Sequence, residues 1–207
     1  MHAYITEALG AFFLVLVFGF TGDPLAIGLT LMALVYIGFP ISGAHYNPAV
    51  SIAFFLKRKL RAADFLGYIV SQVMGGFFAA IVIYFLSSSV FYVEPPTDTG
   101  LYQQTFVEVF FVSIFVMVML MLSLSNLHRK NQFVGIIIGL TFTGMLMVST
   151  PVSGGVLNPT ISIGTALFDF IMGGDSYKHI LLYTIAPLCG GALAAFTFAY
   201  FNPKWGE

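Results

Sequence analysis

The chain has 207 residues, of which 58% are hydrophobic and only 8% are charged. Soluble domains carry about 25% charged residues, so this composition excludes an ordinary soluble domain and indicates a protein whose solvent is the lipid bilayer. The net charge of −1 argues against a nucleic-acid partner. Cys189 is the only cysteine, which excludes an internal disulfide and a thiolate metal cluster.

Six long apolar runs predict membrane-crossing helices. They cover about residues 3–20, 25–42, 63–86, 103–124, 133–150 and 178–200. Each is close to the roughly 20 apolar residues that a hydrocarbon layer of about 30 Å requires. No basic leader precedes the first run, and Glu7 interrupts it, so we expect a first membrane helix and not a cleaved signal peptide. The prediction is one all-α, polytopic membrane domain over residues 1–207.

Two shorter apolar segments, about 47–56 and 158–168, do not fit this scheme as spans. A helix of ten residues is about 15 Å long, half the hydrocarbon thickness. Each segment begins with Asn-Pro. Proline suits the first turn of a helix, where its missing N–H costs nothing, and asparagine suits the N-cap position before it. We therefore expect two re-entrant half-helices.

The basic residues of the loops indicate the orientation. They are Lys57, Arg58, Lys59 and Arg61 after the first short segment, Arg129 and Lys130 between the fourth and fifth spans, and Lys204 in the tail. With a cytoplasmic N-terminus all of these fall on the cytoplasmic side, and only Lys178 falls outside. We expect both termini in the cytoplasm, and the compact loops favour a bacterial inner (plasma) membrane.

The two halves of the chain resemble each other. Ile27–Ile52 and Ile138–Ile163 align without a gap and share Ile-Gly-Leu-Thr, a proline, Ser-Gly and Asn-Pro at matching positions. Glu7 in the first span has its counterpart in Glu108 in the fourth. Because each half crosses the membrane an odd number of times, the second half enters from the opposite side, which makes an inverted repeat.

This repeat defines half-repeats 1–86 and 101–202, joined outside the membrane by the linker 87–100. Its two half-helices would meet N-terminus to N-terminus near the midplane, where each end carries roughly half a positive charge. Two facing positive ends repel cations, including hydronium, while Asn47 and Asn158 supply amide donors.

The residues before the two asparagines would turn their carbonyl acceptors toward the lumen. These residues are Gly43, Ala44 and His45 in the first half and Gly155, Val156 and Leu157 in the second. Donors at the middle and acceptors along the path suit a single file of neutral hydrogen-bonding molecules. We expect His45 to line the pore chiefly through its carbonyl, and the alternative is that its ring is a pH gate, because histidine titrates near neutrality.

The segments SGAHYNPAVS and SGGVLNPTIS resemble the two signature motifs of the aquaporin (major intrinsic protein) family. Their tripeptides are Asn47-Pro48-Ala49 and Asn158-Pro159-Thr160, with threonine in place of the usual alanine. The resemblance covers the whole chain, including Gln72 in the third span and Pro187 in the sixth. It implies a pore through each subunit, a homotetramer, and passive passage of water or small uncharged solutes such as glycerol, ammonia, hydrogen peroxide or gases.

By the same resemblance, Glu7 and Glu108 accept hydrogen bonds from backbone N–H groups and hold the half-helix loops in place. The alternative is a proton relay, which would make the protein a proton-coupled secondary transporter. The equivalent positions of the two glutamates favour the supporting role, because both halves have the same loop to hold.

The family's constriction falls on Ile27, Leu146, Gly155 and Ile161, counted from the two motifs. Water-selective members resembling this chain carry Phe, His, a small residue and Arg at these positions, and glycerol facilitators keep the Arg. An apolar filter without that cation favours less polar solutes and a wider opening. We expect a relaxed filter, and the alternative is an ordinary water channel whose filter is reshaped by neighbouring side chains.

Two other classes of protein fit the sequence less well. A structural or adhesive membrane protein would need larger loops, and it would leave the paired Asn-Pro motifs unexplained. An enzyme would need a nucleophile with its base, a metal-ligand cluster or a cofactor fingerprint, and the sequence has none of these. We therefore expect a channel with no enzymatic activity, no metal and no cofactor.

Overall fold

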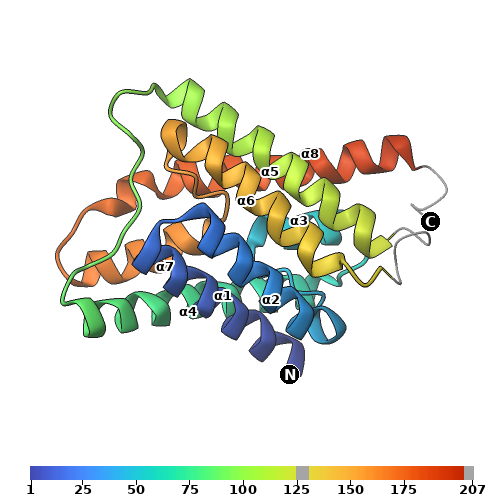
Figure 1. Ribbon diagram of the computed structural model, residues 1–207, viewed down its shortest axis with the longest axis horizontal. Helices are drawn as coiled ribbons and strands as arrows, with labels where there is room; N and C mark the ends of the chain where they lie inside the picture. Colours follow the sequence, from blue (N-terminus) through green and yellow to red (C-terminus); the bar gives the residue numbers. More distant parts are fainter. Residues whose placement is uncertain (125–130, 203–207) are drawn as a thin grey trace.

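The structure is a computed structural model that describes residues 1–124 and 131–202. These residues form an all-helical fold (Figure 1). The elements are α1 (His2–Thr21), α2 (Pro24–Ser42), α3 (Pro48–Leu56), α4 (Ala62–Ser87), α5 (Leu101–Leu124), α6 (Val134–Ser153), α7 (Pro159–Ile171), the 3-10 helix η1 (Ser176–His179) and α8 (Ile180–Phe201). Within the described residues, 6 segments are long and apolar enough to cross a membrane, namely α1, α2, α4, α5, α6 and η1 with α8. The predicted fold class is confirmed.

The predicted spans agree with these helices to within a few residues, and the largest differences are at helix ends. The helix α6 continues through Pro151 to Ser153, beyond the predicted end at residue 150. Gly154 ends it in the left-handed region, with φ of 85°, and donates its N–H to the carbonyl of Thr150. Glycine at this position, and not the proline, sets the end of the helix. The predicted basic residues Arg129, Lys130 and Lys204 lie outside the described residues.

Two helix pairs, α1 with α4 and α5 with α8, pack in equivalent ways. A Cβ atom built on Gly75 of α4 would collide with the carbonyl oxygen of Ala8, and one built on Gly190 of α8 would lie 2.6 Å from that of Val109. Ala8 and Val109 each directly follow one of the two matched glutamates. Small residues allow the helix backbones to approach this closely, so the repeat seen in the sequence extends to the helix contacts.

The helices α2 and α6 meet at a pair of glycines that are equivalent in the repeat. A Cβ atom on Gly28 would lie 2.7 Å from the carbonyl oxygen of Gly139, and one on Gly139 would lie 2.5 Å from that of Gly28. The two halves are therefore in backbone contact at matching positions.

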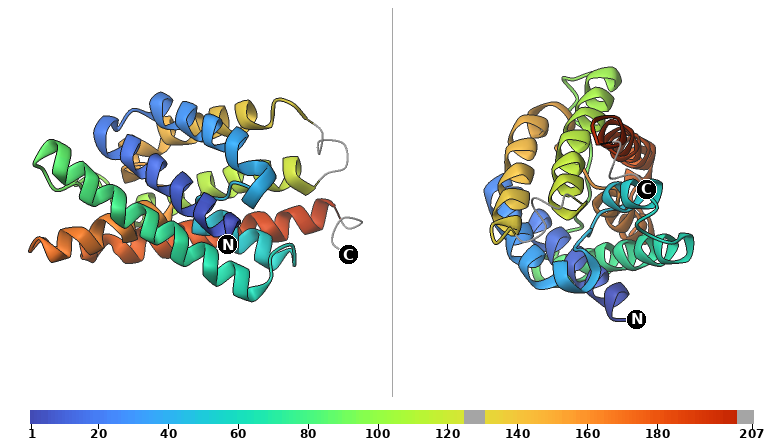
Figure 2. Two further views of the ribbon diagram at one scale, coloured as in Figure 1. Left: turned by 90° about the horizontal axis from the view of Figure 1, so that it is seen from below. Right: turned by 90° about the vertical axis from the view of Figure 1, so that its right-hand side faces the viewer.

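Each short helix packs against a long helix of the other half. A Cβ atom on Gly76 of α4 would lie 2.8 Å from the carbonyl oxygen of Thr160 in α7, and one on Gly191 of α8 would collide with that of Ala49 in α3. Figure 1 shows α3 and α7 placed toward opposite ends of the molecule, and the end-on view in Figure 2 shows the long helices packed around the interior. The half-helices are thus held by contacts that cross between the halves.

Candidate functional site

Asn47 and Asn158 join the two half-helix loops through reciprocal hydrogen bonds. Asn47 Nδ2 donates to the carbonyl of Leu157 at 3.0 Å, and Asn158 Nδ2 donates to the carbonyl of Tyr46 at 3.0 Å. Each asparagine also caps its own helix, because Asn47 Oδ1 accepts from the N–H of Ala49 at 2.8 Å and Asn158 Oδ1 accepts from that of Thr160 at 3.0 Å. The N-termini of α3 and α7 therefore lie together in the buried interior.

The two loops before the asparagines have the same unusual backbone conformation. Positive φ angles occur at Gly43, Ala44 and Tyr46 in the first half and at Gly154, Gly155 and Leu157 in the second. These positions are equivalent in the repeat. A residue other than glycine in the left-handed region costs about 1–2 kcal/mol, so Ala44, Tyr46 and Leu157 are strained. The glutamates behind the loops supply the compensating bonds.

Glu7 lies behind the first loop and is completely buried. Its Oε1 accepts from Ser42 Oγ at 2.6 Å and from the N–H of His45 at 2.9 Å. Its Oε2 accepts from the N–H of Tyr46 at 2.6 Å and from Gln72 Nε2 at 2.7 Å. Four donors from three segments converge on one carboxylate, which holds the strained loop against α1 and α4.

Glu108 supports the second loop in the same way, with one donor fewer. Its Oε1 accepts from Ser153 Oγ at 2.7 Å and from the N–H of Val156 at 3.1 Å, and its Oε2 accepts from the N–H of Leu157 at 2.8 Å. Both ion pairs between described residues, Arg61–Asp64 and Lys178–Asp175, are elsewhere. The two carboxylates are therefore satisfied by neutral hydrogen-bond donors.

The sequence of the chain was compared with models of known protein families, and one family matches almost its whole length. The model of the family described as "Major intrinsic protein" matches residues 1–198. The chain belongs to the major intrinsic protein family. It is an integral membrane protein and a passive channel for water and small solutes, and it is not an enzyme. The alternative of a proton-coupled transporter receives no support.

Relatives of this major intrinsic protein include proteins named aquaporins and one named a glycerol uptake facilitator. The glycerol uptake facilitator protein-like 6 of Lactiplantibacillus plantarum is 37% identical, over 95% of this chain and 96% of the relative. Aquaporin Z of Photorhabdus laumondii is 29% identical, over 84% of this chain and 79% of the relative. The structure of the aquaglyceroporin from Plasmodium falciparum matches with a TM-score of 0.81 over 98% of this chain and 95% of that one. Because the two sequences are only 24% identical, this match shows that the two proteins share a fold and no more than that.

A pair of tyrosines, which we did not single out as supports from the sequence, completes the loop scaffold of this major intrinsic protein. Tyr68 donates its hydroxyl hydrogen to the carbonyl of Ser42 at 2.7 Å, and Tyr183 donates to that of Ser153 at 2.5 Å. Each tyrosine precedes the Gly-Gly pair of its helix by seven residues. When the third and sixth spans are aligned on these glycines, the two tyrosines fall at the same position, and this match could have identified them from the sequence.

The four residues counted as the filter come from different elements. Ile27 lies on α2, Leu146 on α6 and Ile161 on α7, and all three are at most 1% exposed within one hydrophobic cluster. Gly155 lies in the second loop with φ of 64°, where a Cβ atom would lie 2.5 Å from Thr150 Oγ1. No charged side chain is among the four.

Thr160, at the alanine position of the second motif, faces α4. Its Cγ2 atom would lie 3.0 Å from a Cβ atom on Gly76, and its Oγ1 is enclosed without a hydrogen-bond partner. The methyl group of Thr160 therefore packs against α4 in this major intrinsic protein.

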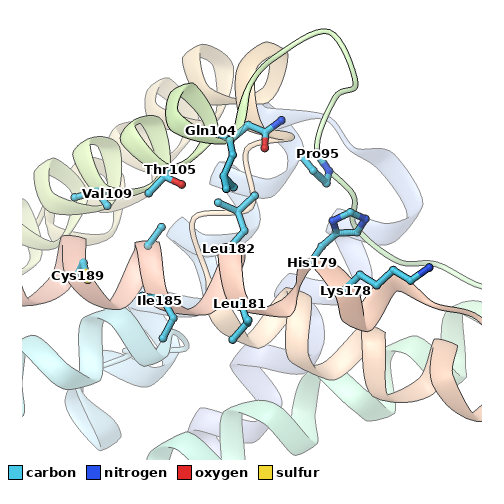
Figure 3. Close-up of a pocket in the computed structure, with 12 residues that line it drawn as sticks. Pro95, Gln104, Thr105, Val109, Lys178, His179, Leu181, Leu182, Ile185 and Cys189 are labelled. Carbon is cyan, nitrogen blue, oxygen red and sulfur yellow. The ribbon is translucent and has the colours of Figure 1, made fainter.

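A hollow of about 540 Å³ lies apart from the paired asparagines, between α5 and α8 (Figure 3). Its walls include Thr105 and Val109 of α5 and Leu182, Ile185 and Cys189 of α8. It is mostly apolar, and its lining contains no residue of either Asn-Pro motif.

Proposed function

We propose that small uncharged molecules cross the membrane within a single chain, past the paired Asn47 and Asn158. The reciprocal bonds between the two loops carry this proposal. Each amide group has two hydrogens, and one of them is used on the opposite loop. The second hydrogen of each amide is left to donate to a passing molecule. Two donors at one point orient such a molecule at the middle of its path.

The proposed path excludes ions and protons at the same point. The N-termini of α3 and α7 each carry roughly half a positive charge, and in this arrangement they face each other across the path. The carbonyls of Gly43, Ala44 and His45 are the acceptors of the first loop. Those of Gly155, Val156 and Leu157 are the acceptors of the second. The strained backbone of both loops supports this assignment, because strain of this kind is concentrated at functional sites.

The proposed constriction consists of Ile27, Leu146, Gly155 and Ile161. Its side chains offer no hydrogen bonds, so a solute must tolerate partial loss of its hydration there. This property favours less polar neutral solutes, with glycerol, ammonia, hydrogen peroxide and gases as members of the class beside water. The relative named a glycerol uptake facilitator supports the inclusion of a small polyol.

We also propose a homotetramer with cytoplasmic termini in a bacterial plasma membrane, built from half-repeats 1–86 and 101–202 and the linker 87–100. The family resemblance supports the tetramer. The basic residues between α3 and α4, with only Lys178 on the other side among the described spans, support the orientation. The Lactiplantibacillus relative supports the bacterial membrane.

The test is stopped-flow light scattering on liposomes that contain the purified protein, with water and glycerol gradients measured separately. We expect clear glycerol flux above that of empty liposomes. Asn158→Asp is the matched control, since it keeps the size of the side chain and its capping oxygen but removes the amide donor and adds a negative charge. One lost hydrogen bond of about 1–1.5 kcal/mol corresponds to roughly a tenfold lower permeability.

Two outcomes would contradict parts of this proposal. Strong water flux with little glycerol flux would refute the relaxed filter and favour an ordinary water channel. Wild-type flux in a correctly folded Asn158→Asp variant would refute a path between the two asparagines.

A further inference from the structure

We infer that Gln72 and Ser51 fix the ring of His45 as the neutral tautomer with its hydrogen on Nε2. The two residues are positioning residues for a side-chain donor beside the first half-helix loop. Sequence motifs alone leave the ring of His45 open between a passive lining and a titrating gate. The direction of each hydrogen bond around Glu7 decides between them.

The chain of bonds starts at Glu7, which can only accept when it is ionised. Its two oxygens receive four donors, so the carboxylate uses its full acceptor capacity without carrying a hydrogen of its own. Gln72 must therefore direct its Nε2 toward Glu7, at 2.7 Å. Rotating this amide by 180° would place its oxygen against the carboxylate, which is repulsive.

The second hydrogen of the Gln72 amide then fixes Ser51. Gln72 Nε2 also lies 3.0 Å from Ser51 Oγ, so the hydroxyl oxygen accepts this bond. The hydroxyl has one hydrogen of its own to donate, and among the described residues the one acceptor within reach of it is His45 Nδ1, 3.1 Å away. A hydrogen on Nδ1 would occupy the second lone pair of Ser51 Oγ and leave the buried hydroxyl hydrogen without an acceptor, so we assign Ser51 Oγ as the donor and Nδ1 as the acceptor without a hydrogen. In a neutral ring the hydrogen is then on Nε2.

The surroundings hold the ring in this orientation. The centre of the His45 ring lies 4.4 Å from that of Phe54 of α3, with the two rings tilted by 37°, and 5.2 Å from that of Tyr68 of α4 in an edge contact. Nε2 lies on the side of Gly43. His45 is 5% exposed, and among the described residues Nε2 has no hydrogen-bond partner. The proposed tautomer leaves its hydrogen to be donated to a small molecule on the proposed path.

The same bonds oppose protonation of the ring. A hydrogen on Nδ1 would face the hydroxyl hydrogen of Ser51, and Ser51 would have to give up its donor role. The titratable groups nearest the ring are Tyr68 of α4 and, behind the loop, Glu7 of α1. The neighbours from α3 are Ser51 and Phe54, which carry no charge. We expect the ring to stay neutral from pH 8 to pH 5.5.

The second half lacks this device. Val156 occupies the place of His45, and Pro187 occupies the place of Gln72 when the Gly-Gly pairs of α4 and α8 are aligned. Glu108 accordingly has no donor from α8. The polar chain is therefore specific to the first loop and is not required to hold a half-helix.

The test determines directly which nitrogen of the His45 ring carries a hydrogen, by solid-state NMR of the protein with ¹⁵N-labelled histidine in liposomes. Subtracting the spectrum of His45→Asn assigns the His45 nitrogens among the four histidines. We expect a protonated Nε2 and a bare Nδ1 throughout pH 5.5–8. Ser51→Ala removes the donor to Nδ1 and should lower the tautomer ratio about fivefold, the effect of one hydrogen bond, and the ring should then titrate. Ser51→Thr keeps a hydroxyl and should restore the wild-type spectrum.

A hydrogen on Nδ1 in the wild type, or a Ser51→Ala spectrum like that of the wild type, would overturn the inference. Gln72→Leu tests the first link, and we expect a mixture of tautomers there. The inference rests on the proposed function only for the place of His45 beside the path. Liposomes that pass no solute while the tautomer is as expected would refute the proposed function and leave this inference supported.

Discussion

Each half of the molecule closes its half-helix loop with the same set of parts. In the first half these are Glu7, Ser42 and Tyr68, and in the second Glu108, Ser153 and Tyr183. The bonds agree in their direction and in the atoms they join. Because both half-helices meet the same requirement for a buried, strained loop, the sequence of each half keeps the residues that satisfy it.

The halves differ in what stands beside that scaffold. The first loop has a chain of polar side chains, Gln72, Ser51 and His45. At the matching positions the second half keeps the serine, as Ser162, but has Pro187 and Val156 in place of the other two. Symmetry is therefore kept where the backbone must be held, and it is lost among the side chains that stand beside the first loop. The following predictions test that separation.

The largest expected effect is on stability, when either buried glutamate is removed. Glu7→Ala leaves four donors without an acceptor and Glu108→Ala leaves three, and each buried unpaired group costs about 1–3 kcal/mol. We expect both variants to unfold well below the wild-type temperature in detergent, with Glu7→Ala the less stable. Thermal unfolding at one fixed scan rate measures this.

Glu7→Gln and Glu108→Gln are the size-matched controls, since each keeps one acceptor oxygen. Equal losses for the two alanine variants would mean that the bond from Gln72 adds nothing to the first half. A less stable Glu108→Ala would contradict the comparison.

The next largest effect is expected where the half-helices cross to the opposite half. Gly191→Ala would push a methyl group into the carbonyl of Ala49, and Gly76→Ala would place one 2.8 Å from that of Thr160. Overpacking of this kind costs about 1–3 kcal/mol, and we expect the larger loss for Gly191→Ala. Gly144→Ala is the control, because nothing lies within 4 Å of the added Cβ. It should be neutral or slightly stabilising, since alanine favours the helix by up to about 1 kcal/mol.

The thermal unfolding temperatures of these three variants give the order directly. If Gly76→Ala is the most destabilising, the tighter contact does not lie between α3 and α8. If Gly144→Ala matches the other two, helix propensity and not close packing explains the losses.

The sequence predicts those parts of the fold that depend on local signals. Apolar length marks the spans, and Asn-Pro marks the start of α3 and α7, because a cap and a first-turn proline act within a few residues. The end of α6 at Ser153 was placed too early, since the interior Pro151 fits a last helical turn that Gly154 ends. The partners of the glutamates were expected as backbone groups, which His45, Tyr46, Val156 and Leu157 provide.

The sequence does not predict contacts that exist only after the helices assemble. Gln72 lies 65 residues from Glu7 and 21 from Ser51, and only the packing of α4 against both brings its amide to them. Local sequence patterns also do not predict that each half-helix packs against a long helix of the other half. For the filter, sequence counting gives the identities of Ile27, Leu146 and Ile161, and their roles remain a proposal.

The smallest effect is expected at a pair of equivalent hollows outside the proposed path. Cys189 lines the one between α5 and α8, and Met74, its equivalent before the Gly-Gly pair, lines one of about 260 Å³ between α1 and α4. Both residues are exposed on the outer surface of the bundle. A membrane-permeant thiol reagent on Cys189, or on Met74→Cys in a Cys189→Ser background, should leave water permeability in liposomes unchanged, with labelling confirmed by mass spectrometry. If labelling at one site alone lowers water permeability, the two halves differ in their outer surface as well as in their loops. If labelling at either site lowers it, the path lies beside the hollows and not between the two asparagines.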